Sequence, residues 1–148
     1  LSDTMPDERY QLLFESVKIG PVVAPNRFYQ VPHCNGMGYR DVSAMAALRA
    51  IKAEGGWGVV NTEQVEIHHT SEITPFIELR IWDDRDLPAL SRITNAVHTH
   101  GALAGIELAY NGINGHPMCV SPMLESSIAR EFFLRKIISF LDVSENRS

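Results

Sequence analysis

Residues 26–38 read Asn26-Arg27-Phe28-Tyr29-Gln30-Val31-Pro32-His33-Cys34-Asn35-Gly36-Met37-Gly38. The stretch from Phe28 to Val31 predicts a short buried strand, and Pro32 ends it because proline has no N–H for a sheet hydrogen bond. Cys34 therefore follows the carboxyl end of a strand, where barrels and open α/β sheets place their chemistry. Two interpretations stay open at this point. Cys34 is either a reactive thiol whose pKa is lowered by its neighbours, or a small buried hydrophobic side chain.

Length and composition are typical of one globular domain: 148 residues, 45% hydrophobic and 21% charged. The net charge of -5 argues against nucleic acid or an anionic membrane as a partner. No apolar stretch approaches the roughly 20 residues that span a bilayer. The first ten residues show no signal-peptide pattern. With Cys34 and Cys119 expected to be reduced thiols, these features predict a cytoplasmic protein.

The remaining pattern predicts alternating strands and helices. Residues 1–11 are expected to form a loose arm, and Gly20-Pro21 to turn a small hairpin. Further strands are expected at 57–65 and 102–108. Helices are expected at 41–54, capped by Asp41 or Ser43 and stopped by Gly55-Gly56, and at 86–100, capped by Asp86. Their expected apolar positions include Met45, Leu48, Ile51, Leu87, Leu90, Ile93, Ala96 and Val97. The order hairpin-β-α-β-α-β implies an α/β fold with a parallel sheet.

Other candidate residues lie near the ends of these strands. Glu63 and Gln64 fall near the end of the strand at 57–65. Glu107 stands among apolar residues, where a carboxylate is costly unless it is paired or meets a ligand. A ligand contact and a buried salt bridge, to Arg27 or Lys52, are the two interpretations, and the strand-end position favours the ligand. No metal site is expected, because the histidines lack ligand spacing and His116 with Cys119 supplies only two ligands.

Several stretches together resemble one family. They are Phe14-Glu15, Ile19-Gly20-Pro21, and residues 26–38, 52–57, 61–63, 81–83 and 100–108. They resemble the trimethylamine, dimethylamine and histamine dehydrogenases, a subgroup of the old yellow enzyme (NADH:flavin oxidoreductase) family. The resemblance runs from about Tyr10 to about Pro117, and the motif from Val31 to Gly36 is highly specific to the subgroup.

The resemblance implies an FMN-dependent oxidoreductase that oxidises a C–N centre of a small methylated or primary amine. The residues implied to contact FMN are Val31, Pro32, His33, Cys34, Gln64 and Glu107. The sulfur of Cys34 is implied to bond to C6 of the flavin, giving 6-S-cysteinyl FMN. Gln64 is also implied to face the substrate. Trimethylamine dehydrogenase has a Tyr at that position for cation–π contact, whereas Gln64 suits an amine that can donate an N–H.

The implied fold is the N-terminal part of a (β/α)₈ TIM barrel, since a complete barrel needs roughly 250 residues. Residues 1–117 are expected to form the barrel portion, and residues 118–148 an atypical tail that is helical at 126–141. The tail either covers the edge of the third strand or is unrelated sequence. Two alternatives to an enzyme stay open: a non-catalytic barrel remnant, and an interaction module that pairs through its open sheet edge, including as a homo-oligomer.

Overall fold

The computed structural model describes residues 7–71 and 78–111. In chain order the elements are η1 (Glu8–Phe14), β1 (Val17–Ile19), β2 (Val22–Ala24), β3 (Tyr29–Gln30), α1 (Val42–Glu54), β4 (Val59–Glu66), β5 (Leu79–Arg80), η2 (Asp84–Asp86), α2 (Leu87–His98) and β6 (Leu103–Ala109). The expected tail, its helix and Cys119 lie outside the described residues. The order hairpin-β-α-β-α-β is confirmed, with β5 as an addition.

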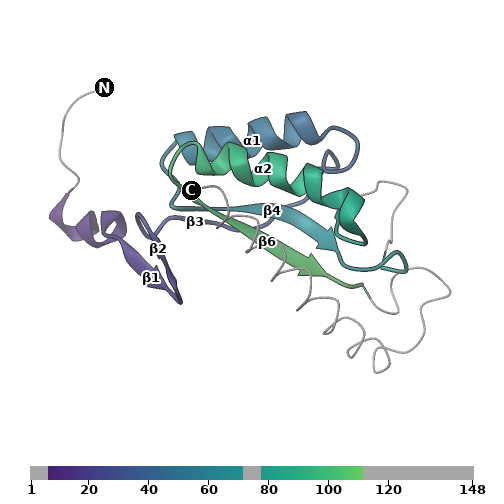
Figure 1. Ribbon diagram of the computed structural model, residues 1–148. Coiled ribbons are helices and arrows are strands. Elements are labelled where there is room, and N and C mark those ends of the chain that lie inside the picture. Colours follow the sequence, from purple (N-terminus) through teal and green to yellow (C-terminus); the bar gives the residue numbers. More distant parts are fainter. Residues whose placement is uncertain (1–6, 72–77, 112–148) are drawn as a thin grey trace.

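The central strand of the sheet is β4 (Figure 1). It pairs in parallel with β3 at its start, through Tyr29 and Val59, and with β5 at its end, through Val65 and Leu79. Along its other edge it pairs in parallel with β6. In a parallel sheet the carboxyl ends of all strands meet at one edge, so the segments that follow β3, β4 and β6 gather there.

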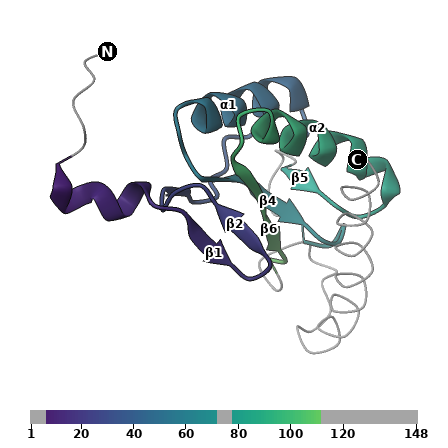
Figure 2. The same cartoon turned by 60° about the vertical axis from the view of Figure 1, so that its left-hand side comes forward.

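Helices α1 and α2 lie side by side over one face of this sheet (Figures 1 and 2). The expected cap of α1 is confirmed: the carboxylate of Asp41 accepts a hydrogen bond from the N–H of Ala44 at 2.9 Å. The helix ends at Gly55, and Gly56 then adopts a φ of 94°, which glycine reaches without steric cost. The two glycines are therefore a helix stop.

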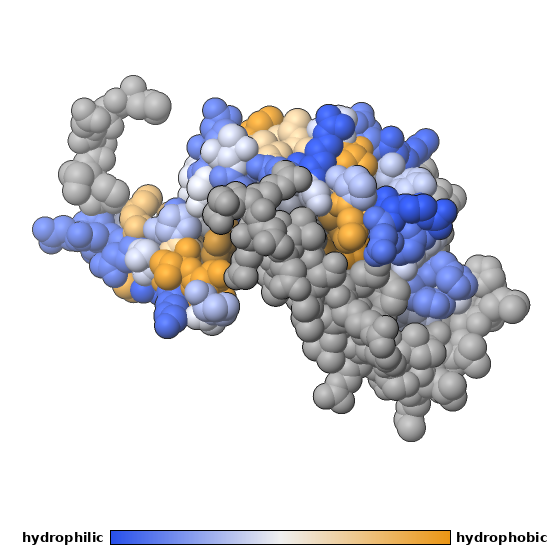
Figure 3. All heavy atoms as spheres, viewed as in Figure 1, coloured by the Kyte–Doolittle hydropathy of each residue, from blue (hydrophilic) through white to orange (hydrophobic). Residues whose placement is uncertain are grey.

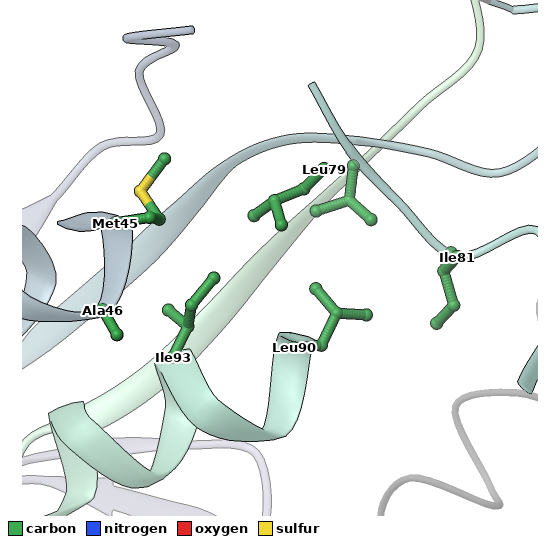
Figure 4. Packing of buried hydrophobic residues seen from close by; sticks show 7 residues of the cluster. Met45, Ala46, Leu79, Ile81, Leu90 and Ile93 are labelled. Atoms are coloured by element: carbon green, nitrogen blue, oxygen red, sulfur yellow. The ribbon is translucent and has the colours of Figure 1, made fainter. Parts of the chain in front are cut away.

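The core fills the space between the two helices and the sheet. Figure 4 shows Ile93 and Leu90 of α2 near Leu79 of β5, with Met45 from α1 beside them. These side chains are at most 2% exposed, and full burial of each stabilises the fold by about 1.5–3 kcal/mol. A second cluster comprises Ala53, Val60, Val97 and Ala102. Ile51, which was expected on the apolar face of α1, is instead 64% exposed.

The hairpin of β1 and β2 stands apart from the sheet (Figure 1), and its turn at Gly20-Pro21 is confirmed. Figure 3 shows hydrophobic side chains at the surface beside it, and Ile19, Val22 and Val23 are exposed. The loose arm expected for residues 1–11 was wrong for residues 8–11, which lie in η1. Asp7 caps this turn by accepting from the N–H of Arg9 at 3.0 Å.

The first parallel strand is shorter and less buried than expected. β3 has only two residues, and Tyr29 and Val31 are 51% and 65% exposed while Gln30 is buried. Alternate residues of a strand face opposite sides, and only one side of β3 meets the helices. The two-residue strand β5 was not predicted, because Leu79 and Arg80 carry too short a pattern to indicate a strand.

Asp86 does not cap α2 with its side chain, contrary to the expectation. Its buried carboxylate instead accepts hydrogen bonds from Arg80 at 2.8 Å, and from the N–H groups of Trp82 and Asp83 at 3.0 and 3.2 Å. It thereby closes η2, whose own cap is Asp83. Among the described helices, none is long and apolar enough to cross a membrane.

Candidate functional site

Cys34 lies in a loop of residues 31–35, called here the Cys34 loop, at the carboxyl end of the sheet. The residue is exposed, which contradicts its interpretation as a buried hydrophobic side chain. Its thiol hydrogen-bonds to the carboxylate of Glu78, and the backbone N–H of Gln64 donates to the sulfur. Three segments that are distant in sequence therefore meet at one thiol.

The pKa of the Cys34 thiol is raised from 9.0 to about 11. Desolvation of the sulfur is the largest cause, and the hydrogen bond to Glu78 and the charges of Glu78 and Glu63 act in the same direction. Only the N–H of Gln64 opposes them. A reactive thiol was expected to have a lowered pKa, and that expectation is wrong. The sequence gives no sign that two glutamates from separate segments converge on this sulfur.

Gln64 and Glu107 lie next to one another, because they are register partners in the β4–β6 ladder. Glu107 is exposed, so the cost of burial that singled it out does not apply to it. The alternative salt bridge is also absent among the described residues: Arg27 donates to the carbonyl of Leu12 at 2.9 Å, and Lys52 faces His33. Cys34, Gln64 and Glu107 thus follow one another along the same end of the sheet.

The buried carboxylate of this region is Glu63, which is 0% exposed. Its Oε2 accepts from the N–H of Asn35 at 3.2 Å, and its Oε1 accepts from the N–H of Leu79 at 3.1 Å. Burial raises the pKa of Glu63, and these two hydrogen bonds and the charge of Arg49 counteract the rise. Glu63 therefore ties the Cys34 loop to β5.

The side chain of His33 faces helix α1. Its ring nitrogens face the side chains of Arg49 and Lys52 on α1, at 3.1 and 3.4 Å. Burial lowers the pKa of His33, and the positive charges of Arg49 and Lys52 lower it further. The imidazole is therefore held neutral on the helix side of the loop.

The other histidines of the described residues are not grouped as a metal site. His68 hydrogen-bonds to Thr70 at 2.8 Å through Nδ1, and its ring stacks on that of His69. Within residues 7–71 and 78–111, no three His, Cys, Asp or Glu side chains are grouped so that they could hold a metal ion.

The family model described as NADH:flavin oxidoreductase / NADH oxidase matches residues 12–145. The chain belongs to this family. The match extends beyond Pro117, where the resemblance was expected to end, and the boundary between residues 1–117 and the tail stays a prediction. The recognised subgroup is confirmed by the relatives that follow.

Three relatives are dehydrogenases or oxidases of amines. The dimethylamine dehydrogenase of Hyphomicrobium sp. (strain x) is 51% identical over 106 residues, which are 72% of this chain and 14% of that protein. The structure of histamine dehydrogenase from Rhizobium sp. 4-9 matches with a TM-score of 0.71 and 70% identity, over 74% of this chain and 17% of that one. The structure of 6-hydroxypseudooxynicotine amine oxidase from Pseudomonas geniculata N1 matches with a TM-score of 0.70 and 50% identity, over 73% of this chain and 16% of that one.

The relatives of known structure are TIM barrels, so the expected fold class is confirmed. In the described residues the parallel sheet is an open part of such a barrel, and it does not close. The chain spans about a sixth of the length of these relatives, as the 14–17% coverage states.

The residues around Cys34 fit the flavin that defines this family. Gln64 Nε2 and Asn35 Nδ2 are buried donors without a hydrogen-bond partner among the described residues. A buried donor left unpaired costs about 1–3 kcal/mol, which a ligand that offers an acceptor removes. A flavin ring carries carbonyl acceptors and an N–H donor on its pyrimidine edge. The side-chain amide of Gln64 can donate to a flavin carbonyl, and the exposed carboxylate of Glu107 can accept from the flavin N–H.

Three residues of this site were not assigned a role from the sequence. Glu63 was noted only for its place in the strand, and Arg49 and Glu78 were passed over. The one available signal was a charged residue at a core-facing helix position, since Arg49 follows Met45 by four residues on α1. Glu78 carried no signal of its own.

Proposed function

We propose that this chain contributes the N-terminal part of the active site of an FMN-dependent amine dehydrogenase. The observation that carries the proposal is the convergence of Cys34, Gln64 and Glu107 at one sheet edge. There the backbone N–H of Gln64 donates to the thiol, and the buried side-chain Nε2 of Gln64 has no hydrogen-bond partner among the described residues. Membership of a flavin oxidoreductase family and the similarity to three amine-oxidising proteins support it.

In this proposal the Cys34 loop lies along the flavin, through Val31, Pro32, His33 and Cys34. Gln64 and Glu107 hold the pyrimidine edge as donor and acceptor. When bound, FMN supplies the acceptor for the electron pair that leaves the amine carbon. Cys34 is the residue that carries the 6-S-cysteinyl link. Forming that link would break the S–H bond of Cys34 and the C6–H bond of the flavin, and would release two electrons to an external oxidant such as dioxygen. The hydrogen-bonded carboxylate of Glu78 is placed to accept the thiol proton.

The proposed substrate is a small amine, bound as a cation. Glu78 supports this, because its Oε2 is buried and has no hydrogen-bond partner among the described residues. An ammonium group donates to such an oxygen in a charge-assisted hydrogen bond. Gln64 contacts the same thiol as Glu78, and its side-chain amide oxygen can accept a hydrogen bond from an N–H of the amine. A cytoplasmic location belongs to the same proposal and follows from the sequence only.

The test is the absorption spectrum of the purified 148-residue chain. We expect flavin colour that survives acid precipitation and that is no longer acid-stable in Cys34→Ala, while the control Cys119→Ala keeps it. A colourless chain would contradict the proposal and favour a non-catalytic remnant. Sedimentation of that colourless chain as a defined dimer would favour an interaction module.

Substrate binding is tested on the coloured protein by anaerobic titration with dimethylamine and with histamine. We expect bleaching of the flavin absorbance, and an apparent Kd about 10–100-fold weaker in Glu78→Gln, as the loss of a charge-assisted hydrogen bond predicts. Glu54→Gln, an exposed glutamate at the end of α1, is the matched control. Equal Kd values in wild type and Glu78→Gln would remove Glu78 from the amine site.

A further inference from the structure

We propose that Arg49 is a positioning residue that fixes the Cys34 loop from the α1 side and so sets how Cys34 faces Gln64. Its importance for a flavin link rests on the proposed function, whereas its hold on the loop does not.

The guanidinium of Arg49 reaches both the end of β3 and the loop that follows. Its Nη2 donates to the carbonyl of His33 at 2.8 Å. Its Nη1 donates to the amide oxygen of Gln30 at 3.3 Å and lies 3.1 Å from His33 Nδ1. One planar group therefore holds three acceptors in fixed relative positions, which the single ammonium of a lysine cannot reproduce.

Burial of the Arg49 guanidinium costs free energy, because the charge loses its hydration. The residue is 0% exposed, and burial lowers the pKa of its guanidinium. Among the described residues it forms no salt bridge, and its Nε has no hydrogen-bond partner. An apolar side chain, such as that of Met45 one turn earlier, would fill the space between helix and sheet without desolvating a charge. The polar contacts to the loop are what the guanidinium adds.

The Cys34 loop is anchored on both sides of its cysteine. Arg49 holds the carbonyl of His33, directly before Cys34. Glu63 holds the N–H of Asn35, directly after it. Cys34 is thus presented between two residues whose backbone groups are fixed to buried charged side chains. The charges of Glu63 and Cys34 favour the protonated guanidinium, and because such interactions are mutual, Arg49 favours the thiolate.

The imidazole of His33 reports on this arrangement. Arg49 donates toward Nδ1, so Nδ1 must be the acceptor and the ring must be neutral. The groups that face the ring are Arg49 and Lys52 of α1, the amide of Gln30, and the backbone of Val31, whose hydrogen bond acts to raise the pKa. Removal of Arg49 takes away a positive charge and its hydrogen bonds to the loop backbone and Gln30. Removal of Lys52 takes away a charge and one contact with the His33 ring, and leaves the hydrogen bonds of Arg49 in place.

The experiment measures two signals by NMR in Arg49→Met, Arg49→Lys and the control Lys52→Met. The first is the rate of hydrogen exchange of the Asn35 backbone amide, divided by the rate for the Leu103 amide. The Leu103 amide is the reference because it donates to the carbonyl of Gly58, so its exchange reports on the stability of the sheet. The second is the imidazole ¹⁵N titration of His33. Leu90→Ala, a core variant far from the loop in sequence, controls for loss of overall stability.

We expect the Asn35 amide to exchange at least about tenfold faster in both Arg49 variants, as the loss of one or two buried hydrogen bonds predicts. The pKa of His33 should rise in Arg49→Met and in Lys52→Met, but Lys52→Met and Leu90→Ala should leave the ratio of Asn35 to Leu103 exchange unchanged. An unchanged ratio in folded Arg49→Lys would overturn the proposal, and this variant keeps the charge should Arg49→Met fail to fold. If the wild type is colourless while these shifts appear, the proposed function fails and the role of Arg49 stands.

Discussion

Gln64 of β4 lies opposite Glu107 of β6 because β4 carries one more residue than β6 between this pair and the pair of Asn61 and Gly105. This irregularity is a β-bulge, and bulges redirect the side chains that follow them. Without it, Gln64 would be shifted by one position relative to β6. The bulge therefore helps bring Gln64 to the sheet edge where Cys34 lies.

Gly105→Ala should destabilise the fold by about 1–3 kcal/mol, the usual cost of overpacking. A Cβ at Gly105 would fall on the side-chain oxygen of Asn61, whose amide also donates to the carbonyl of Gln30. Urea unfolding checks the expectation, and Gly55→Ala is the control, since a Cβ there meets only carbonyl oxygens at 3.3–3.4 Å. Equal midpoints for the two variants would show that the Asn61 contact is not needed.

Glu78→Gln should make Cys34 more reactive. Glu78 raises the pKa of this thiol through a hydrogen bond and through its charge, so its neutralisation should bring the pKa down from about 11. The alkylation rate with iodoacetamide as a function of pH, in a Cys119→Ser background, measures the change. Glu54→Gln should leave the pH profile where it is. A profile that Glu78→Gln does not move would mean that desolvation alone sets the pKa.

Glu63→Gln should change how stability depends on pH. The pKa of Glu63 is raised above 4.5 in the folded chain, so folding favours its protonated form. That stabilisation is present in full below pH 4.5 and is lost as the pH rises through the raised pKa. The glutamine does not titrate. Urea unfolding at several pH values should therefore show wild type losing stability relative to Glu63→Gln as the pH increases, and a difference that is constant with pH would refute this.

Asp86→Asn should lower the free energy of unfolding by about 1.5–3 kcal/mol, because the carboxylate is 6% exposed and accepts three hydrogen bonds. The matched control is Asp7→Asn, which removes an ion pair with Arg9 at 2.6 Å at the surface. Exposed pairs contribute about 0–1 kcal/mol, so little change is expected there. Similar losses in both variants would contradict a special role for Asp86.

The sequence was sufficient for the elements whose signals are local. The cap at Asp41, the stop at Gly55 and Gly56, and the helical spacing of Leu90, Ile93 and Val97 are carried by neighbouring residues, and the structure has them as expected. The capping role expected of Asp86 was wrong because Arg80 and two backbone N–H groups compete for its carboxylate. A tertiary contact outweighed a local preference.

The candidate site also has features that the sequence indicated and features that depend on tertiary contacts. The motif around Cys34 is continuous in sequence, and it pointed to a family to which the chain proved to belong. The pKa of Cys34, the burial of Glu63 and the contacts of Arg49 involve residues 15 to 44 positions from Cys34 along the chain, as their numbering in the sequence shows. No spacing rule relates these positions.

By itself, the sequence determined the α/β order of this chain, its parallel sheet and the strand-end position of Cys34, because hydrophobic periodicity and turn residues act over a few positions. Only the tertiary structure decided that this thiol lies beside two glutamates and is held protonated. It also decided that the carboxylate of Glu63 is buried while that of Glu107 is exposed, and that Arg49 hydrogen-bonds to the loop. The physical reason is that desolvation and charge–charge interaction depend on distance in space, which is set by the packing of α1 and β5 against β4.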